Sequence, residues 1–161
     1  TDAERSLRQA VELGEEMGLP AKKLVRLYYW LADIVWNWQP RYKEGLRLGM
    51  EGLQLLPNNE QSIEVAMMNT VISISLSMLG DPESIEFGLR NAAFVRDLAY
   101  CEEMRVVYSS IAYAYLNMRD VESALEWLDL FEEEAFVTAC KAAFETYAGS
   151  YACTARLVSP S

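Results

Sequence analysis

The stretch YKEGLRLGMEGLQLLPNN, from Tyr42 to Asn59, decides how the rest of the chain is interpreted. Its leucines recur at helical spacing, and Pro57-Asn58-Asn59 predicts the end of that helix. Glycines stand inside it at positions 45, 49 and 52, although a glycine in a helix interior costs about 1 kcal/mol relative to alanine. We therefore expect another helix to approach closely along this face.

The same internal spacing returns elsewhere in the chain. Four segments carry small or apolar residues at one position and at the positions four and seven further on, namely Ala3/Leu7/Ala10, Gly45/Gly49/Gly52, Ile85/Leu89/Ala92 and Ala124/Leu128/Phe131. Their starting positions differ by 42 (45 − 3), 40 (85 − 45) and 39 (124 − 85) residues. This even spacing predicts an internal repeat.

Apolar residues follow helical spacing throughout, and no stretch shows the alternation typical of a strand. The spacing predicts an all-α fold of seven to eight helices. Predicted helices cover residues 2–17, 21–38, 42–56, 62–79, 82–98, 102–118 and 120–130, with Asp2 as the N-cap of the first. The segment 62–79 is apolar nearly all round, which predicts a central helix enclosed on both sides.

The C-terminal part allows two interpretations. No glycine or proline lies between Asp120 and Ala148, so one long helix is possible. We favour a break at Glu132–Glu134 and a separate helix over 135–148, because acidic residues stabilise a helix N-terminus and oppose a C-terminus. Residues 157–161 are predicted to form a frayed tail.

The stretch that ends in Pro57-Asn58-Asn59 closely resembles the second helix of a tetratricopeptide (TPR) repeat. In this family an aromatic residue is followed three positions on by a small residue. A second small residue stands seven positions after the first. Tyr42, Gly45, Gly52 and Pro57 match this pattern. Further matches are Ala112, Tyr115 and Ala124 in one unit, and more weakly Ser73, Leu76, Ile85 and Ala92 in another.

The resemblance implies a superhelix, that is, a solenoid of antiparallel helix hairpins. The pairs would cover residues 21–57, 62–98 and 102–132, flanked by helices at 2–17 and 135–148, in a single domain spanning 1–156. The chain departs from the family in its period of 39 to 42 residues, where about 34 is usual. It also has Asp33 at a small-residue position or, alternatively, an inserted residue near Gln39-Pro40. HEAT-type repeats, whose period is nearer to 40, therefore remain an alternative.

Composition excludes several classes of function. Apolar residues make up 52% of the chain, and the formal net charge is −10, which disfavours binding to nucleic acid. There is no histidine, no glycine-rich phosphate loop and no nucleophile motif, so neither an enzyme, a cofactor nor a metal site is expected. Three widely spaced cysteines are typical of a reduced cytoplasmic protein, and no segment predicts a membrane span. Because the chain begins at Thr1 rather than Met, we expect a piece of a longer protein.

The resemblance implies a concave groove lined by the first helix of each pair. Its predicted exposed positions are Trp30, Ile34 and Asn37, then Thr70, Ile74 and Ser77, and then Ser109, Ser110, Tyr113 and Asn117. Such a mixture of aromatic and small polar residues suits a protein or peptide partner, and the acidic charge favours a basic or amphipathic one. Packing between repeats is the alternative role for Trp30, Ile34 and Ile74.

The sequence thus predicts a non-catalytic binding module that serves as a regulatory or adaptor part of a larger protein. Two other functions stay open. One is a ligand- or peptide-sensing domain of a bacterial signalling regulator, a class in which long TPR-like arrays are common. The other is self-association as a homodimer through the C-terminal helices, for which Phe136 and Phe144 are the candidate contacts.

Overall fold

A computed structural model describes residues 1–37, 40–58, 60–97 and 101–130 of the chain. These residues form seven α-helices and no strand, so the predicted all-α class is confirmed. The helices are α1 (Asp2–Glu16), α2 (Ala21–Asn37), α3 (Tyr42–Gln54), α4 (Ile63–Leu79), α5 (Glu83–Asp97), α6 (Cys101–Asn117) and α7 (Val121–Leu130). The helix predicted at 135–148, the break at 132–134 and the tail at 157–161 lie outside the described residues.

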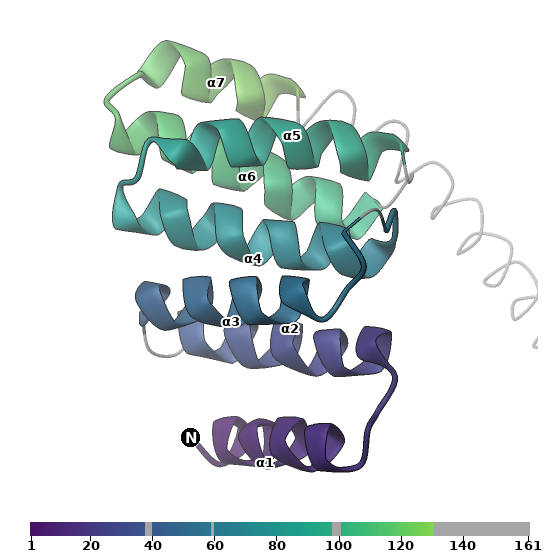
Figure 1. Cartoon of the computed structure of the whole chain (residues 1–161). Coiled ribbons are helices and arrows are strands. Elements are labelled where there is room, and N and C mark those ends of the chain that lie inside the picture. The colour runs from purple at the N-terminus through teal and green to yellow at the C-terminus, as the bar shows by residue number, and fades with distance from the viewer. Residues whose placement is uncertain (38–39, 59, 98–100, 131–161) are drawn as a thin grey trace, which may run out of the picture.

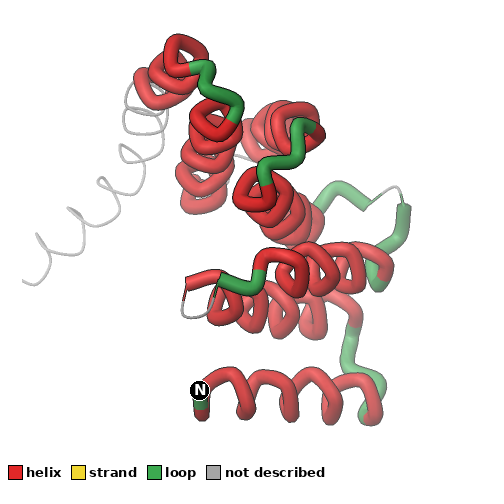
Figure 2. The backbone as a smooth tube through the Cα atoms, turned by 90° about the vertical axis from the view of Figure 1, so that its left-hand side faces the viewer, coloured by secondary structure: helices red, strands yellow, loops and turns green. Residues whose placement is uncertain are grey.

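The helices lie between α1 at one end of the molecule and α7 at the other, with α2 beside α3 and α5 beside α6 (Figures 1 and 2). Each helix packs on the next helix along the chain, and α4 makes contacts with two further helices as well. The even-numbered helices also touch in succession, α2 against α4 and α4 against α6. Side chains on α2, α4 and α6 can therefore form one continuous row.

The glycine face of α3 is where α4 packs. A Cβ atom added to Gly49 would lie 2.8 Å from Cγ1 of Val71 and 2.9 Å from Cγ1 of Ile72. Gly88 of α5 occupies the same kind of place, because a Cβ there would lie 2.5 Å from Cγ1 of Ile111 on α6. The close approach predicted from the glycines is confirmed, and it holds for two successive helix pairs.

One type of turn recurs between helices. Gly80 follows α4 with φ +72°, its N–H donates to the carbonyl of Ser77, and the next N–H, of Asp81, donates to Leu76. Arg119 follows α6 with φ +63° and makes the equivalent bonds to Leu116 and, through Asp120, to Tyr115. This is the Schellman arrangement, which satisfies carbonyls left unpaired at a helix C-terminus.

The first helix begins differently from the prediction. Its N-cap is Thr1, whose Oγ1 accepts the N–H of Glu4 at 3.2 Å, whereas Asp2 is the first helical residue. N-cap preference ranks Asp somewhat above Thr and so favours Asp2, and only the helix start shows which residue can reach the free N–H. Asp120 does cap α7 as predicted, accepting the N–H of Ser123 at 3.1 Å.

Helix α4 joins two apolar cores. Met67, Met68 and Val71 pack with residues of α1, α2 and α3. Ala66 packs with residues of α5 and α6. The prediction that this uniformly apolar segment is enclosed on both sides is confirmed.

Candidate functional site

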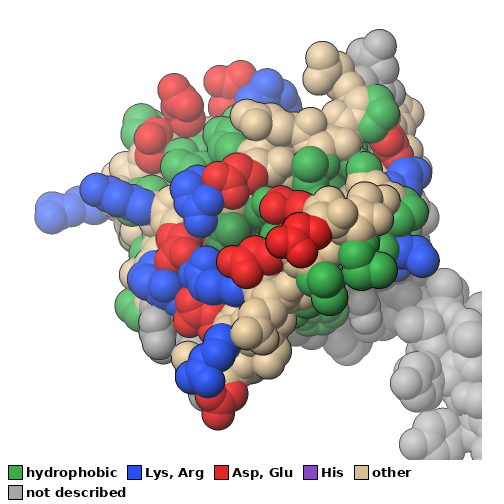
Figure 3. Space-filling model, turned by 60° about the horizontal axis from the view of Figure 1, so that its bottom comes forward, with side chains coloured by type: hydrophobic (Ala, Val, Ile, Leu, Met, Phe, Trp, Pro, Cys, Tyr) green, Lys and Arg blue, Asp and Glu red, His purple; other side chains and the backbone are tan. Residues whose placement is uncertain are grey.

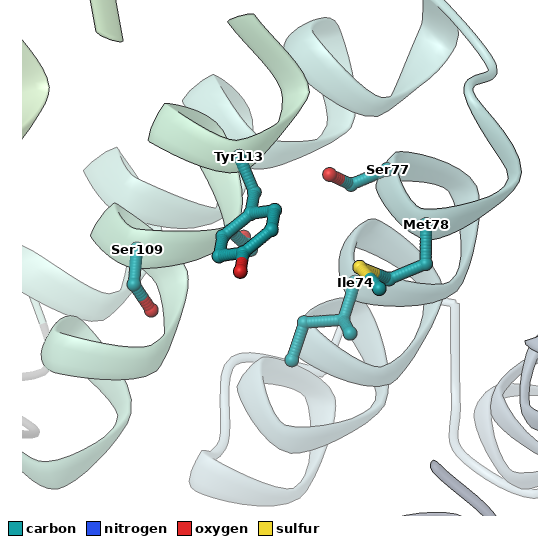
Figure 4. A pocket seen from close by; sticks show the side chains of 6 residues that line it. Ile74, Ser77, Met78, Ser109 and Tyr113 are labelled. Atoms are coloured by element: carbon teal, nitrogen blue, oxygen red, sulfur yellow. The ribbon is translucent and has the colours of Figure 1, made fainter. Parts of the chain in front are cut away.

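A pocket of about 190 Å³ lies between α4 and α6 (Figure 4). Helix α4 contributes Ile74, Ser77 and Met78, and helix α6 contributes Ser109, Ser110 and Tyr113. On each helix these residues are three or four positions apart or adjacent, so they share one side of the helix. Five of the six are among the residues predicted from the sequence to face the groove.

The pocket combines an exposed apolar rim with a polar floor. The Tyr113 ring is 55% exposed and Met78 is 38% exposed, whereas Ser77 and Ser110 are buried. None of the six lining residues carries a charge. Its chemistry therefore suits an apolar side chain with a neutral polar neighbour better than an ion.

Two of the three serine hydroxyls at the pocket are held by their own helix. Ser109 Oγ donates to the carbonyl of Val106 at 2.9 Å, and Ser110 Oγ donates to the carbonyl of Val107 at 2.7 Å. Ser110 Oγ also lies 3.2 Å from Oγ of Ser73 across the α4–α6 interface. Such bonds allow serine to sit inside a helix with its polar atom satisfied.

Ser77 differs from these serines. Its side chain is 1% exposed, and its Oγ has no hydrogen-bond partner among the described residues. Figure 4 shows this hydroxyl directed into the space between the two helices. The Ser77 carbonyl does have a partner, since Nδ2 of Asn117 donates to it at 2.5 Å and ties the end of α6 to α4. A buried hydroxyl without a partner costs free energy until a ligand atom or water satisfies it.

Three residues predicted to be exposed in the groove are buried, namely Thr70, Ser77 and Ser110. Thr70 is fully buried rather than exposed, because α5 packs over it. Its Oγ1 donates to the carbonyl of Ala66 and accepts Nδ2 of Asn91 at 3.0 Å. Ser77 and Ser110 were also expected to be exposed and are buried, because α4 and α6 approach closely enough to cover them.

The predicted groove residues on α2 lie on a part of the surface separate from the α4–α6 pocket. Trp30 is 55% exposed and stacks edge-on against Tyr29, while Ile34 is half-buried and Asn37 is exposed. Asn37 Nδ2 donates to Oδ1 of Asp33 at 2.8 Å, and burial raises the pKa of that carboxyl. None of these residues lines the α4–α6 pocket.

Met78 was missed by the sequence analysis. It stands four residues after Ile74, on the same side of the helix, and this spacing could have identified it as a groove residue. Because the segment is apolar all round, the sequence gives no indication which of its apolar residues remains outside the core.

Comparison with known proteins gives no match. No family model, no curated protein and no solved structure matches the chain. What the site can do is therefore inferred from its own geometry and charge.

Two basic residues of α2 are bound to acids. Lys22 Nζ lies 2.5 Å from Oε1 of Glu60, and Arg26 Nη2 lies 2.7 Å from Oε1 of Glu64. Figure 3 shows the Lys and Arg side chains interleaved with Asp and Glu on the α1 end of the molecule. Lys22 and Arg26 are thus paired with acids of neighbouring segments.

Glu4 of α1 is the centre of one such cluster. Its Oε1 lies 2.7 Å from Nη2 of Arg41 and 2.8 Å from Nη2 of Arg8. Hydrogen bonds from Arg41 and then Arg8 lower the pKa of Glu4 to about 2. Arg8 also contacts Glu44, so the cluster fastens α1 to the start of α3.

Metal-binding groups do not gather in the described part of the chain. No three His, Cys, Asp or Glu side chains there lie close enough together to hold a metal ion. Within the same residues, no helix has the length and apolar character needed to cross a bilayer. The pocket between α4 and α6 is thus the feature on which a proposal of function can be built.

Proposed function

We propose that this chain is a TPR-like solenoid that binds a protein or peptide segment, without catalysis, at the α4–α6 pocket. The observation that carries the proposal is the convergence of Ile74, Ser77 and Met78 with Ser109, Ser110 and Tyr113 around one open pocket. The solenoid arrangement is supported by the repeated α3–α4 and α5–α6 packing at Gly49 and Gly88, and by the row formed by α2, α4 and α6.

Pocket size favours a side chain of a larger partner over a free small molecule. Small-molecule sites have volumes of about 300–1,000 Å³, and this pocket has about 190 Å³. A leucine, isoleucine or methionine side chain would contact Ile74, Met78 and the Tyr113 ring. Sensing of a small ligand therefore has less support than the binding of a peptide segment, whereas peptide sensing stays open.

The charge of the molecule favours a basic or amphipathic partner. The chain has a formal net charge of −10, and the pocket itself is uncharged. Long-range attraction would bring a basic segment to the surface, and the apolar anchor would then fix its position. We place this activity in the cytoplasm, as a regulatory or adaptor part of a larger protein.

Panning a phage-displayed library of random peptides against residues 1–161 tests the proposal. We expect enriched peptides to share an aliphatic anchor and to bind less tightly as salt is added. Tyr113→Ala should weaken them by about tenfold or more, which is the loss expected when a central contact is truncated. The matched control is Leu13→Ala on α1, because Leu13 is also 55% exposed but lies away from the pocket.

Two results would contradict the proposal. Failure to enrich any peptide above the naive library would argue against peptide binding. Peptides that bind Tyr113→Ala and the unmodified chain equally well would place the binding site elsewhere.

A further inference from the structure

The Ser77 hydroxyl is a polar group that the free protein leaves without a hydrogen bond at the α4–α6 pocket. Its side chain is 1% exposed. Among the buried side-chain atoms of the described chain that lack a hydrogen-bond partner, only Ser77 Oγ belongs to a residue that lines the pocket. An unpaired buried hydroxyl destabilises a fold, because it has lost water without gaining a partner. A ligand that supplies the missing partner accounts for such a group.

The other two serines of the pocket show what Ser77 alone has free. Ser109 Oγ donates its hydrogen to the carbonyl of Val106, and Ser110 Oγ donates to the carbonyl of Val107. A hydroxyl has one hydrogen and two lone pairs, so these two oxygens can still accept a hydrogen bond but have no hydrogen left to donate. The pocket floor therefore combines a free serine donor on α4 with serine acceptors on α6.

We propose that this floor recognises a primary carboxamide, the group carried by asparagine and glutamine side chains. The carboxamide oxygen accepts the hydrogen of Ser77 Oγ, and the carboxamide NH2 group donates to the serine oxygens of α6. In the bound segment this group stands beside the aliphatic anchor. The inference rests on the proposed function, because it names what the same pocket selects in its partner.

Other chemical groups satisfy the floor less well. A carboxylate could accept the Ser77 hydrogen, but none of the six lining residues carries a positive charge, and the chain is acidic overall. An ammonium group has no lone pair for that hydrogen. Burying either ion without a counter-charge costs more than burying a neutral amide. A purely aliphatic group leaves the hydroxyl unpaired.

Isovaleramide is a suitable probe, because its isobutyl group suits the apolar rim and its carboxamide suits the floor. We expect it to bind the full chain with a Kd of about 1–10 mM, as a fragment of this size should. Binding is measured from the shifts of the backbone amide NMR signals of Ile74, Ser77 and Tyr113, which line the pocket.

Two compounds of the same shape isolate the carboxamide. Isovalerate replaces the amide with a carboxylate, and we expect it to bind at least about tenfold more weakly because its charge is not compensated. Methyl isobutyl ketone keeps the carbonyl oxygen but lacks the NH2 group. It should bind about threefold more weakly, which is the loss of one hydrogen bond.

Ser77→Ala removes the hydroxyl and keeps the backbone carbonyl that accepts from Asn117. We expect this variant to bind isovaleramide about five- to tenfold more weakly than the unmodified chain does. Its urea midpoint of unfolding should be equal or higher, because an unpaired polar group has been removed. The matched control is Ser62→Ala, because Ser62 is also buried but lies outside the pocket. It should bind isovaleramide as the unmodified chain does.

Four results would overturn the inference. Isovaleramide could leave the pocket signals unchanged at about 100 mM. Isovalerate or the ketone could bind as tightly as the amide. Ser77→Ala could bind isovaleramide without loss. It could also unfold at a clearly lower urea concentration, which would show that the hydroxyl is already bonded in the free protein.

Failure of this inference is distinguishable from failure of the proposed function. Enriched peptides that depend on Tyr113 but show no preference for asparagine or glutamine would overturn the carboxamide site alone. Isovaleramide binding that depends on Ser77, with no peptide enriched, would support the carboxamide site and contradict peptide binding.

Discussion

Arg119 adopts a backbone conformation that suits glycine better than arginine. Its φ of +63° lies in the left-handed region, as does the φ of +72° at Gly80 in the equivalent turn. The two turns have the same pattern of backbone hydrogen bonds, so they differ mainly in the Cβ atom at this position. The repeat therefore provides its own comparison of glycine with a larger residue in one turn.

Replacing Arg119 by glycine should stabilise the protein. The left-handed conformation costs a non-glycine residue about 1–2 kcal/mol, and the greater freedom of glycine in the unfolded chain cancels part of this gain. We expect Arg119→Gly to raise the free energy of unfolding by about 0.5–1 kcal/mol, measured by urea denaturation. Arg119→Ala is the control, because it removes the guanidinium group but keeps the Cβ atom. A similar gain in both variants would show that charge, not backbone conformation, is responsible.

For single polar residues on these helices, the sequence alone does not predict whether the side chain is buried. Thr70 and Ser110 stand on helices with apolar residues on nearly every side, where the sequence does not distinguish a groove position from a core position. The structure buries both and gives each a hydrogen-bond partner. Tyr113, by contrast, is exposed as predicted.

At the scale of helices, the distance between α3 and α4 depends on glycine. Gly49 leaves no room for a Cβ atom beside Val71 and Ile72. The sequence predicted this close contact, because three glycines in one helix need a reason to be there. It did not identify the residues on α4 that make the contact, which depend on the rotation of both helices.

Gly49→Leu should push these helices apart. Adding a large side chain to a filled interface costs about 1–3 kcal/mol of stability, which urea denaturation followed by circular dichroism would measure. Met50→Leu is the control, because Met50 is the adjacent residue and is 39% exposed. Its stability should change by less than about 0.5 kcal/mol. Equal stability of Gly49→Leu and the unmodified chain would show that α3 and α4 do not pack as described.

At the scale of the whole molecule, the helices of the stack differ in how many neighbouring helices they pack against. Helix α4 contacts α2, α3, α5 and α6, whereas among the described helices α1 packs on α2 alone. Ion pairs from Glu4 and Arg8 add a polar link between α1 and α3. Partly exposed pairs of this kind contribute about 0–1 kcal/mol each, so they do not replace an apolar interface.

Amide hydrogen exchange should follow this difference. We expect the amides of α4 to exchange most slowly and those of α1 to exchange faster, because α1 can separate with the loss of one apolar interface. Mass spectrometry of peptides from residues 2–16 and 63–79 would measure both rates. Equal protection of the two helices would mean that the stack unfolds as one cooperative unit.

The sequence by itself determined the helices, most of their ends and the repeated spacing, because all of these follow from local patterns. The 3.6-residue apolar period, the glycine and proline stops and the aspartate cap of α7 each act within a few residues. Only the tertiary structure decided which side chains meet. It brings α4 and α6 together at Ile74 and Tyr113. It also pairs Arg26 with Glu64 and buries Thr70 under α5. The physical reason is that a helix of known length can still rotate and shift against its neighbours, and the packing of both partners fixes that freedom.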